Sequence, residues 1–346
     1  MIDPTLAEFA RRIPKAELHV HIDGTLEPEM KLEIARRNGV PLAESTTEEI
    51  RASYVFHDLP TFLAVHYPNM AVLRTEQDYF DLCQGYLARA HAQGVRHVEI
   101  FFDPQLHTSR GVAFGTMIGG YRRAILSERE RTGISAELIM CFLRDRGIDD
   151  ALATWEQSEP YRDWMIGVGL DSDEKDHPPV EFVEVFSRAR QAGLRVTVHC
   201  DIDQENTHEH IRQALVELQV DRIDHGTNVV EDAALLALAR ERGIGFTVCP
   251  LSNSFVTATM KADEIVALVR EGIPVSISSD DPPYFGGYAG DNYAVLADRV
   301  GAQAADVAAW ARSSFRAAWL PPDRREAYLA DVDRFVREYP AISSVT

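Results

Sequence analysis

The sequence contains no run of 18 consecutive apolar residues, the approximate length that a membrane-spanning helix requires. Its first seventeen residues also lack the apolar segment of a secretory leader, so we expect no signal peptide. Cysteine is scarce: Cys83, Cys141, Cys200 and Cys249 are the four in 346 residues, and no two have the C-x-x-C spacing. We therefore predict buried thiols in a reducing compartment, and a cytoplasmic protein.

Positive charge is also in short supply. The chain has 35 Lys and Arg residues against 54 Asp and Glu residues, which gives a formal net charge of −19. Such a surface repels the phosphates of nucleic acids and anionic lipids, so we expect neither nucleic acid nor membrane as a partner. A small nitrogenous substrate is compatible with this charge.

Short β-rich runs alternate with longer amphipathic segments along the whole chain. Most of the short runs are continuously apolar, which is typical of parallel strands buried on both faces. The predicted strands are Ala16–Ile22, Val95–Phe102, Ala136–Leu143, Met165–Asp171, Arg195–Cys200, Arg222–His225, Gly245–Cys249 and Pro274–Ser279. Helices are predicted between them at Thr75–Gln93, Gly115–Arg131, Pro179–Gln191, Glu209–Gln219 and Asp232–Arg242.

Eight strand-then-helix units predict an α/β fold of the (β/α)8 TIM-barrel type. The competing fold is a doubly wound open sheet, which usually carries a glycine-rich phosphate turn after its first strand. Here that strand leads instead into the histidine-containing segment HVHIDGT. We predict a single domain over residues 1–346, with a helical lid at about 42–73 over the C-terminal mouth of the barrel and terminal helices at about 302–339.

Several potential metal ligands lie at the predicted carboxyl ends of the strands. His19 and His21 are two residues apart, so on a strand their side chains point the same way. His199 ends the fifth predicted strand, and Asp280 follows the eighth. Three imidazoles, one carboxylate and an open position suit one divalent metal ion, with Zn²⁺ favoured.

Asp280 and His225 are predicted to assist the attack of a water molecule at this metal. A bound cation lowers the pKa of its water towards 7, and Asp280 could both bind the metal and accept a hydrogen bond from that water. His225 ends the sixth predicted strand and could orient the resulting hydroxide or carry its proton. The alternative for His225 is a structural histidine in the core.

The motifs together resemble the adenosine/adenine deaminase family of the amidohydrolase superfamily. The resemblance extends from about Ile13 to Asn292 through PKAELHVHIDGTLEPE, His199, RIDHG, VCPLSN and SDDPPYFGGY, in that order. The segments VCPLSN, DDPPYFGGY and GVGLDSDEKDHPP are closer to the adenine deaminases. The resemblance implies hydrolytic attack on C6 of a 6-aminopurine by hydroxide formed at the metal, followed by loss of ammonia.

The same resemblance implies residue roles. The metal ligands are His19, His21, His199 and Asp280, and His225 positions the attacking hydroxide. Asp281 hydrogen-bonds the N7 edge of the purine, and the loop at Ser172 and Asp173 contacts N3. Asp23 occupies the position where adenosine deaminases have an Asp that meets the ribose, or it caps a loop.

One position departs from the family pattern. Relatives carry a glutamate three residues after the fifth-strand histidine, and this glutamate protonates purine N1; here that position is Ile202. Asp203 or Glu205 could take over the acid role, with Asp201 a further option, or either could be a solvated loop carboxylate. Otherwise the substrate needs no such proton, or the chain is a weak catalyst that binds metal and a purine-like ligand.

The sequence thus predicts a metal-dependent hydrolase of C–N bonds, acting on the C6 amino group of adenine, an N6-substituted adenine or a related aminated heterocycle. The alternatives are an adenosine-type nucleoside deaminase, an amidohydrolase of altered chemistry, and a non-catalytic metal- and purine-binding protein. The sequence leaves open the exact substrate, the native metal, the pathway and the oligomeric state, including a homo-oligomer. His208 and His210 repeat the H-x-H spacing, but on a predicted helix, where we expect surface positions.

Overall fold

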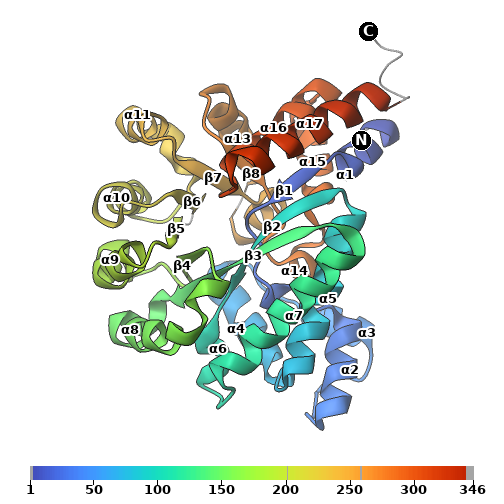
Figure 1. Ribbon diagram of the computed structural model, residues 1–346, viewed down its shortest axis with the longest axis vertical. Helices are drawn as coiled ribbons and strands as arrows, with labels where there is room; N and C mark the ends of the chain where they lie inside the picture. The colour runs from blue at the N-terminus through green and yellow to red at the C-terminus, as the bar shows by residue number, and fades with distance from the viewer. Residues whose placement is uncertain (1–2, 201, 258, 340–346) are drawn as a thin grey trace.

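The computed structural model describes residues 3–200, 202–257 and 259–339. Eight parallel strands form one sheet in the order β1 to β8 (Figure 1). The strands are β1 (Lys15–Glu17), β2 (Val95–Phe102), β3 (Ser135–Leu143), β4 (Gly167–Asp171), β5 (Arg195–Cys200), β6 (Arg222–His225), β7 (Gly245–Val248) and β8 (Val275–Ile277). The first and last strands meet beyond their ends, where Asp280 accepts from the backbone N–H of His21 and donates its own to His19, both at 3.1 Å. The predicted barrel is confirmed.

Helices surround the strands (Figure 1). Most follow a strand and pack their apolar faces on the outside of the barrel, as the alternation of strand and helix requires. They are α1 (Pro4–Arg12), α2 (Pro28–Asn38), α3 (Thr47–Ser53), α4 (Leu59–Asn69), α5 (Glu76–Ala92), α6 (Pro104–Thr108), α7 (Phe114–Thr132), α8 (Gly147–Gln157), α9 (Val183–Gln191), α10 (Thr207–Gln213), α11 (Ala233–Glu241), α12 (Pro250–Val256), α13 (Ala262–Arg270), α14 (Pro282–Phe285), α15 (Ala289–Val300), α16 (Ala304–Ala317) and α17 (Pro322–Glu338).

The inside of the barrel has only a small apolar core. Phe101, Ile139 and Cys141 are fully buried there, with Ile166 and Trp319 against them. Charged side chains occupy much of the remaining interior, as described below for the network beneath the site. The main apolar core therefore lies between the strands and the surrounding helices.

The first strand is shorter than the predicted Ala16–Ile22. The backbone N–H of Leu18 donates to the Ser278 hydroxyl at 3.3 Å instead of to a backbone carbonyl, which interrupts the ladder between β1 and β8. Pairing resumes as isolated bridges, Val20 with Asp280 and His21 with Phe101. His19 and His21 therefore lie on an extended segment beyond β1, and the eighth strand likewise ends at Ile277 rather than Ser279.

A second apolar cluster covers the carboxyl ends of the strands. Phe62 of α4 packs against Tyr284 and Phe285 of α14, and Tyr54 stacks on Tyr284 with ring centroids 4.3 Å apart. This cluster is separate from the main core. The helices of the predicted lid segment thus rest on an apolar support of their own.

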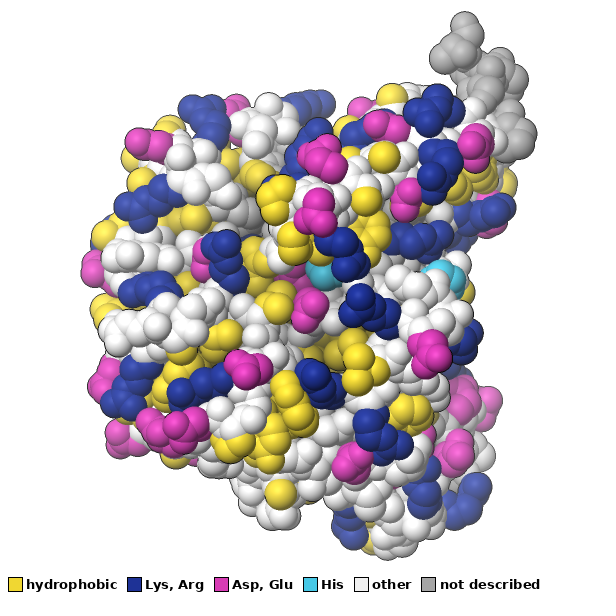
Figure 2. All heavy atoms as spheres, in the orientation of Figure 1, with side chains coloured by type: hydrophobic (Ala, Val, Ile, Leu, Met, Phe, Trp, Pro, Cys, Tyr) yellow, Lys and Arg dark blue, Asp and Glu magenta, His cyan; other side chains and the backbone are white. Residues whose placement is uncertain are grey.

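Figure 2 shows one face of the molecule, on which acidic and basic side chains are interspersed with apolar ones. Within the described ranges, no helix combines the length and the apolar character that crossing a bilayer would require.

Candidate active site

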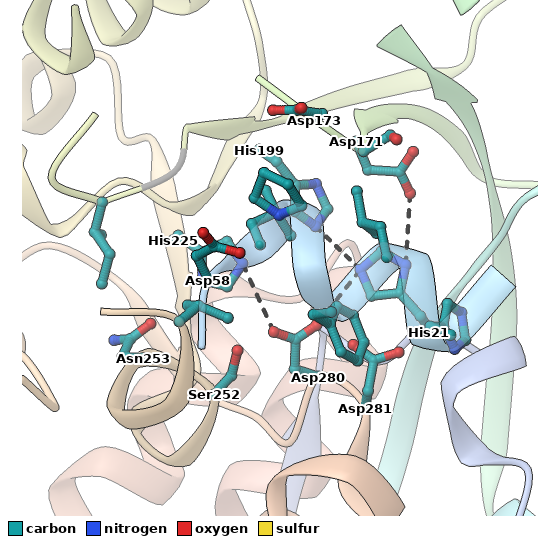
Figure 3. A pocket seen from close by; sticks show the side chains of 18 of the residues that line it. His21, Asp58, Asp171, Asp173, His199, His225, Ser252, Asn253, Asp280 and Asp281 are labelled. Carbon is teal, nitrogen blue, oxygen red and sulfur yellow. Dashed lines mark hydrogen bonds and ion pairs between the residues drawn. The ribbon is translucent and has the colours of Figure 1, made fainter. Parts of the chain in front are cut away.

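A cavity of about 330 Å³ opens at the carboxyl ends of the strands. His21, His199, His225, Asp280 and Asp281 line it, and all follow or end a barrel strand. Their side chains converge from different strands (Figure 3). The structure thus brings these predicted residues together at one end of the barrel.

Three imidazole nitrogens face one another at the base of this cavity. The Nε2 atom of His199 lies 3.1 Å from that of His21 and 3.2 Å from that of His19. Asp280 completes the group, with Oδ1 3.3 Å from His19 Nε2 and 3.5 Å from His21 Nε2. Such short separations between ring nitrogens are typical of ligands that share a cation.

The hydrogen bonds on the far side of two of these rings determine where their protons lie. His199 Nδ1 is 3.1 Å from the carbonyl oxygen of Leu170, which can only accept, so Nδ1 carries the proton. His19 Nδ1 lies 2.8 Å from the hydroxyl of Thr247, which donates its own proton to Asp224. In the neutral form that binds metal, both rings then present bare Nε2 lone pairs, which repel unless a cation lies between them. The donor set fits a divalent ion.

Burial favours the neutral forms of His21, His199 and His225. Desolvation lowers the pKa of His21, holds that of His199 well below its usual range, and lowers that of His225 to about 4. Burial alone would raise the pKa of Asp280, but the adjacent His19, His225 and His21 rings and a hydrogen bond from His19 stabilise its carboxylate and hold the value well below normal. Neutral imidazoles and an ionised carboxylate are the forms that bind metal.

His21 has a carboxylate on its other side. Its Nδ1 atom lies 3.5 Å from Oδ2 of Asp171, which ends β4 (Figure 3). Asp103 follows β2 and also lines the cavity, and desolvation raises the pKa of Asp171 to about 7. No role was predicted for Asp171, although it ends a strand, where a polar residue after an apolar run is the signal that could have found it.

His225 and Asp280 both adopt backbone conformations that are rare for residues with side chains. Their φ angles are 58° and 65°, in the left-handed region. His225 Nε2 approaches Oδ2 of Asp280 to 3.8 Å, while its buried Nδ1 has no hydrogen-bond partner among the described residues. Strain of this kind is concentrated at functional sites in proteins.

Asp281 lies directly over Gly24, the glycine of the segment HIDGT. A Cβ atom added to Gly24 would come within 1.7 Å of Oδ1 of Asp281, so no other residue fits without moving that carboxyl group. Asp281 is 3 % exposed and lines the cavity, and burial, followed by the charge of Asp280, raises its pKa well above the usual range.

The side chain of Asp23 is engaged by neighbouring protein groups. Its Oδ1 atom is 3.0 Å from His107 Nε2 and 3.4 Å from the Tyr121 hydroxyl, and Asp23 is absent from the described lining of the cavity. His107 lies on α6, far along the chain, so its pairing with Asp23 had no signal in the sequence. Ser172 and Asp173 do line the cavity, and Ser172 accepts a hydrogen bond from Tyr67 at 2.7 Å.

The loop after β5 brings different side chains to the cavity from those predicted. Ile202 and Gln204 line the cavity, whereas Asp203 is bound to Lys261 at 2.7 Å and to Asn228 at 3.0 Å. The Asp203 side chain is 44 % exposed, and Glu205 is exposed. Neither predicted acid therefore reaches the cavity, because the loop turns both outward. Asp201 lies outside the described residues.

Other residues also line the cavity, and His66, Ser252, Asn253 and Lys175 among them carried no predicted role. His66 and Tyr67 enter it from α4, Ser252 and Asn253 from α12, and Lys175 from the loop after β4. His210, expected on the surface, is instead buried, with Nδ1 2.5 Å from Glu174. The helix positions its side chain against the β4 loop, a contact that the spacing of the histidines does not reveal.

The comparisons with known proteins agree with one another. A family model described as adenosine deaminase matches residues 14–335. An adenine deaminase from Cupriavidus metallidurans is 47 % identical over 100 % of this chain and 98 % of its own, and an uncharacterized deaminase from Schizosaccharomyces pombe is 45 % identical over 96 % and 99 %.

Solved structures give the same picture. The crystal structure of an adenine deaminase from Arthrobacter aurescens has a TM-score of 0.90 and 41 % identity, covering 94 % of this chain and 99 % of that one. An amidohydrolase from Burkholderia ambifaria with bound zinc has a TM-score of 0.87 and 25 % identity, covering 99 % and 96 %.

Proposed function

Because this chain belongs to the adenosine deaminase family, we propose that it hydrolyses the 6-amino group of adenine or of an N6-substituted adenine. As a deaminase, it is a hydrolase of C–N bonds other than peptide bonds. The observation that carries the proposal is the convergence of three bare Nε2 atoms and one carboxylate at the base of the cavity. Relatives named adenine deaminase, at 46 to 47 % identity over nearly the whole chain, support the choice of substrate.

His19, His21, His199 and Asp280 would hold one divalent cation, which we propose is Zn²⁺. Such a cation supplies Lewis acidity and lowers the pKa of a coordinated water towards 7. Asp280 accepts the proton of the attacking water, and His225 holds that water in line with C6. The 3.8 Å between His225 Nε2 and Asp280 Oδ2 supports a shared role for these two side chains.

The purine is held by groups on opposite sides of the cavity. Asp281, fixed over Gly24, faces the N7 edge, and Ser172 and Asp173 face N3. Phe62 and Phe285 give the cavity apolar surface against which a planar ring packs. These contacts orient C6 towards the histidine cluster.

The charges of the cavity favour a free base over a nucleotide. Six carboxyl groups belong to its described lining, against the ammonium of Lys175: Asp58, Asp103, Asp171, Asp173, Asp280 and Asp281. The raised pKa values of Asp171 and Asp281 favour their neutral forms, so the negative field comes from the other carboxylates. A phosphate group would be repelled by this field. Asp23 is hydrogen-bonded to His107 and lies outside the described lining of the cavity, which supports a free base over a nucleoside.

Ile202 favours a second candidate function. Its side chain is 3 % exposed and lies on the cavity wall, where it has no proton to give to N1. Loss of a general acid costs about 10²–10⁴ in rate. A metal- and purine-binding protein with little turnover is therefore the alternative, and it differs from the first proposal only in the rate of the chemical step.

The experiment is a panel of adenine, N6-methyladenine, adenosine and AMP, followed by absorbance near 265 nm and by release of ammonia or methylamine. We expect turnover of the free bases, little with AMP, and loss of activity with a chelator. His199→Ala should lower activity by more than about 100-fold, since even residues that only support a metal ligand are worth 10–100-fold. His208→Ala, on the exposed face of α10, is the matched control. Binding of adenine without turnover would select the second candidate.

A further inference from the structure

A polar network lies inside the barrel, directly beneath the histidine cluster. Asp224 of β6 accepts hydrogen bonds from the hydroxyls of Thr247 at 2.7 Å and Thr197 at 2.5 Å. Thr247 in turn lies 2.8 Å from His19 Nδ1. All four residues are completely buried, so water cannot substitute for any of these contacts.

The direction of each hydrogen bond follows from the number of protons available. The Thr247 hydroxyl has one proton, and the Asp224 carboxylate can only accept it. The hydroxyl therefore has only lone pairs left for His19, and His19 must donate from Nδ1. That arrangement leaves Nε2 of His19 without a proton and aimed at His199 and Asp280.

The network is anchored to the opposite end of the barrel. Arg222 approaches Asp224 with its Nε atom at 3.6 Å and forms an ion pair with Glu99. The guanidinium also lies over the Trp319 ring at 4.2 Å, and the Trp319 backbone N–H donates to Glu99 at 2.6 Å. The Asp224 carboxylate is thereby held in one orientation, with Oδ1 towards Thr247.

We propose that Thr247 is a positioning residue that fixes the tautomer and the ring orientation of His19. Because its hydroxyl donates to Asp224, its oxygen can only accept from His19 Nδ1. The inference rests on the proposed role of His19 as a metal ligand. Without the Thr247 hydroxyl, His19 Nδ1 would be buried against a group that cannot accept, and the ring would be free to carry its proton on Nε2. A proton there would point at the other ligands and exclude a cation.

Three variants test this proposal. Thr247→Val keeps the shape of the side chain and removes the hydroxyl, Thr247→Ser keeps the hydroxyl, and Thr197→Val removes the other hydroxyl that Asp224 accepts. The apparent Kd for Zn²⁺ is measured on metal-free protein by competition with a chromophoric chelator. The melting temperature of the metal-free protein serves as a control for folding.

We expect Thr247→Val to raise the Kd for Zn²⁺ by about 10–100-fold. The Kd values of Thr247→Ser and of Thr197→Val should both stay within about threefold of the wild-type value. Equal losses in Thr247→Val and Thr197→Val would overturn the proposal, since they would indicate a general effect of disturbing Asp224. Unchanged affinity in Thr247→Val would also overturn it. A wild-type protein that binds no Zn²⁺ would instead refute the proposed function, so the two failures are distinguishable.

Discussion

At the scale of single residues, position 202 determines the chemistry more than any other. The Ile202 side chain lines the cavity, at the chain position where the family resemblance implies a proton donor for purine N1. We predict that Ile202→Glu raises kcat for adenine, with a ceiling of about 10²–10⁴-fold, because the variant restores a general acid. The measurement is the ammonia released per folded enzyme, with adenine at saturation.

Glu205→Gln is the matched control for that experiment. Glu205 is exposed on the same loop and lies outside the described cavity, so its loss should change kcat by less than about twofold. A large loss in Glu205→Gln would restore the catalytic role that the sequence allowed for it. No gain in Ile202→Glu with any of the free bases would count against a purine substrate.

The residues that the sequence could predict are those whose direction follows from strand geometry. His19, His21, His199 and Asp280 stand at strand ends, and barrel strands all present their carboxyl ends to one site. Asp203 was unpredictable because its direction depends on Lys261 and Asn228, which lie far along the chain. The acidic residues of this loop carry no pattern in the sequence that would indicate such pairings.

At the scale of elements, α4 packs on an apolar cluster of its own. Phe62 joins it to α14 through an apolar cluster that is distinct from the main core. Phe62→Ala should therefore increase hydrogen exchange in the 54–69 segment by at least about tenfold, since local opening depends on local apolar contacts. Exchange in α7 should be unchanged.

Phe186→Ala is the counterpart in the main core, where Phe186 is fully buried. This change should lower the free energy of unfolding of the whole chain by about 3–5 kcal/mol. If Phe62→Ala also accelerated exchange throughout the barrel, the lid and the barrel would form one cooperative unit, contrary to the expectation.

Helices and strands were predictable to different degrees. The amphipathic segment Thr75–Gln93 becomes α5 with only its two end residues trimmed, because its apolar periodicity and capping residues agree. The first strand was predicted too long, because a side-chain hydroxyl replaces a backbone partner at Leu18. Apolar patterning cannot report such an exchange, since Leu18 is equally buried in either arrangement.

At the scale of the whole molecule, buried histidines make stability depend on pH. Desolvation lowers the pKa of His66 to about 4, whereas the unfolded value is 6.5. Between pH 6.5 and 4 the unfolded chain therefore binds more protons than the folded one, and the free energy of unfolding falls as the pH falls. For His66 the loss is on the order of 3 kcal/mol across this window.

Urea unfolding of metal-free protein at pH 7, 6, 5 and 4 measures this effect. His66→Gln should lose less stability than the wild type over the same range, because its amide does not titrate. Parallel pH profiles for the two proteins would mean that His66 is protonated in the folded state.

The closing contact of the sheet has a consequence for biosynthesis. Asp280 exchanges backbone hydrogen bonds with His19 and His21, so the ligand set joins residues near the start of the chain to one four-fifths of the way along it. A nascent polypeptide still lacking its eighth strand cannot assemble all four ligands. On the proposed ligand set, the complete metal site therefore forms only after most of the chain has left the ribosomal tunnel.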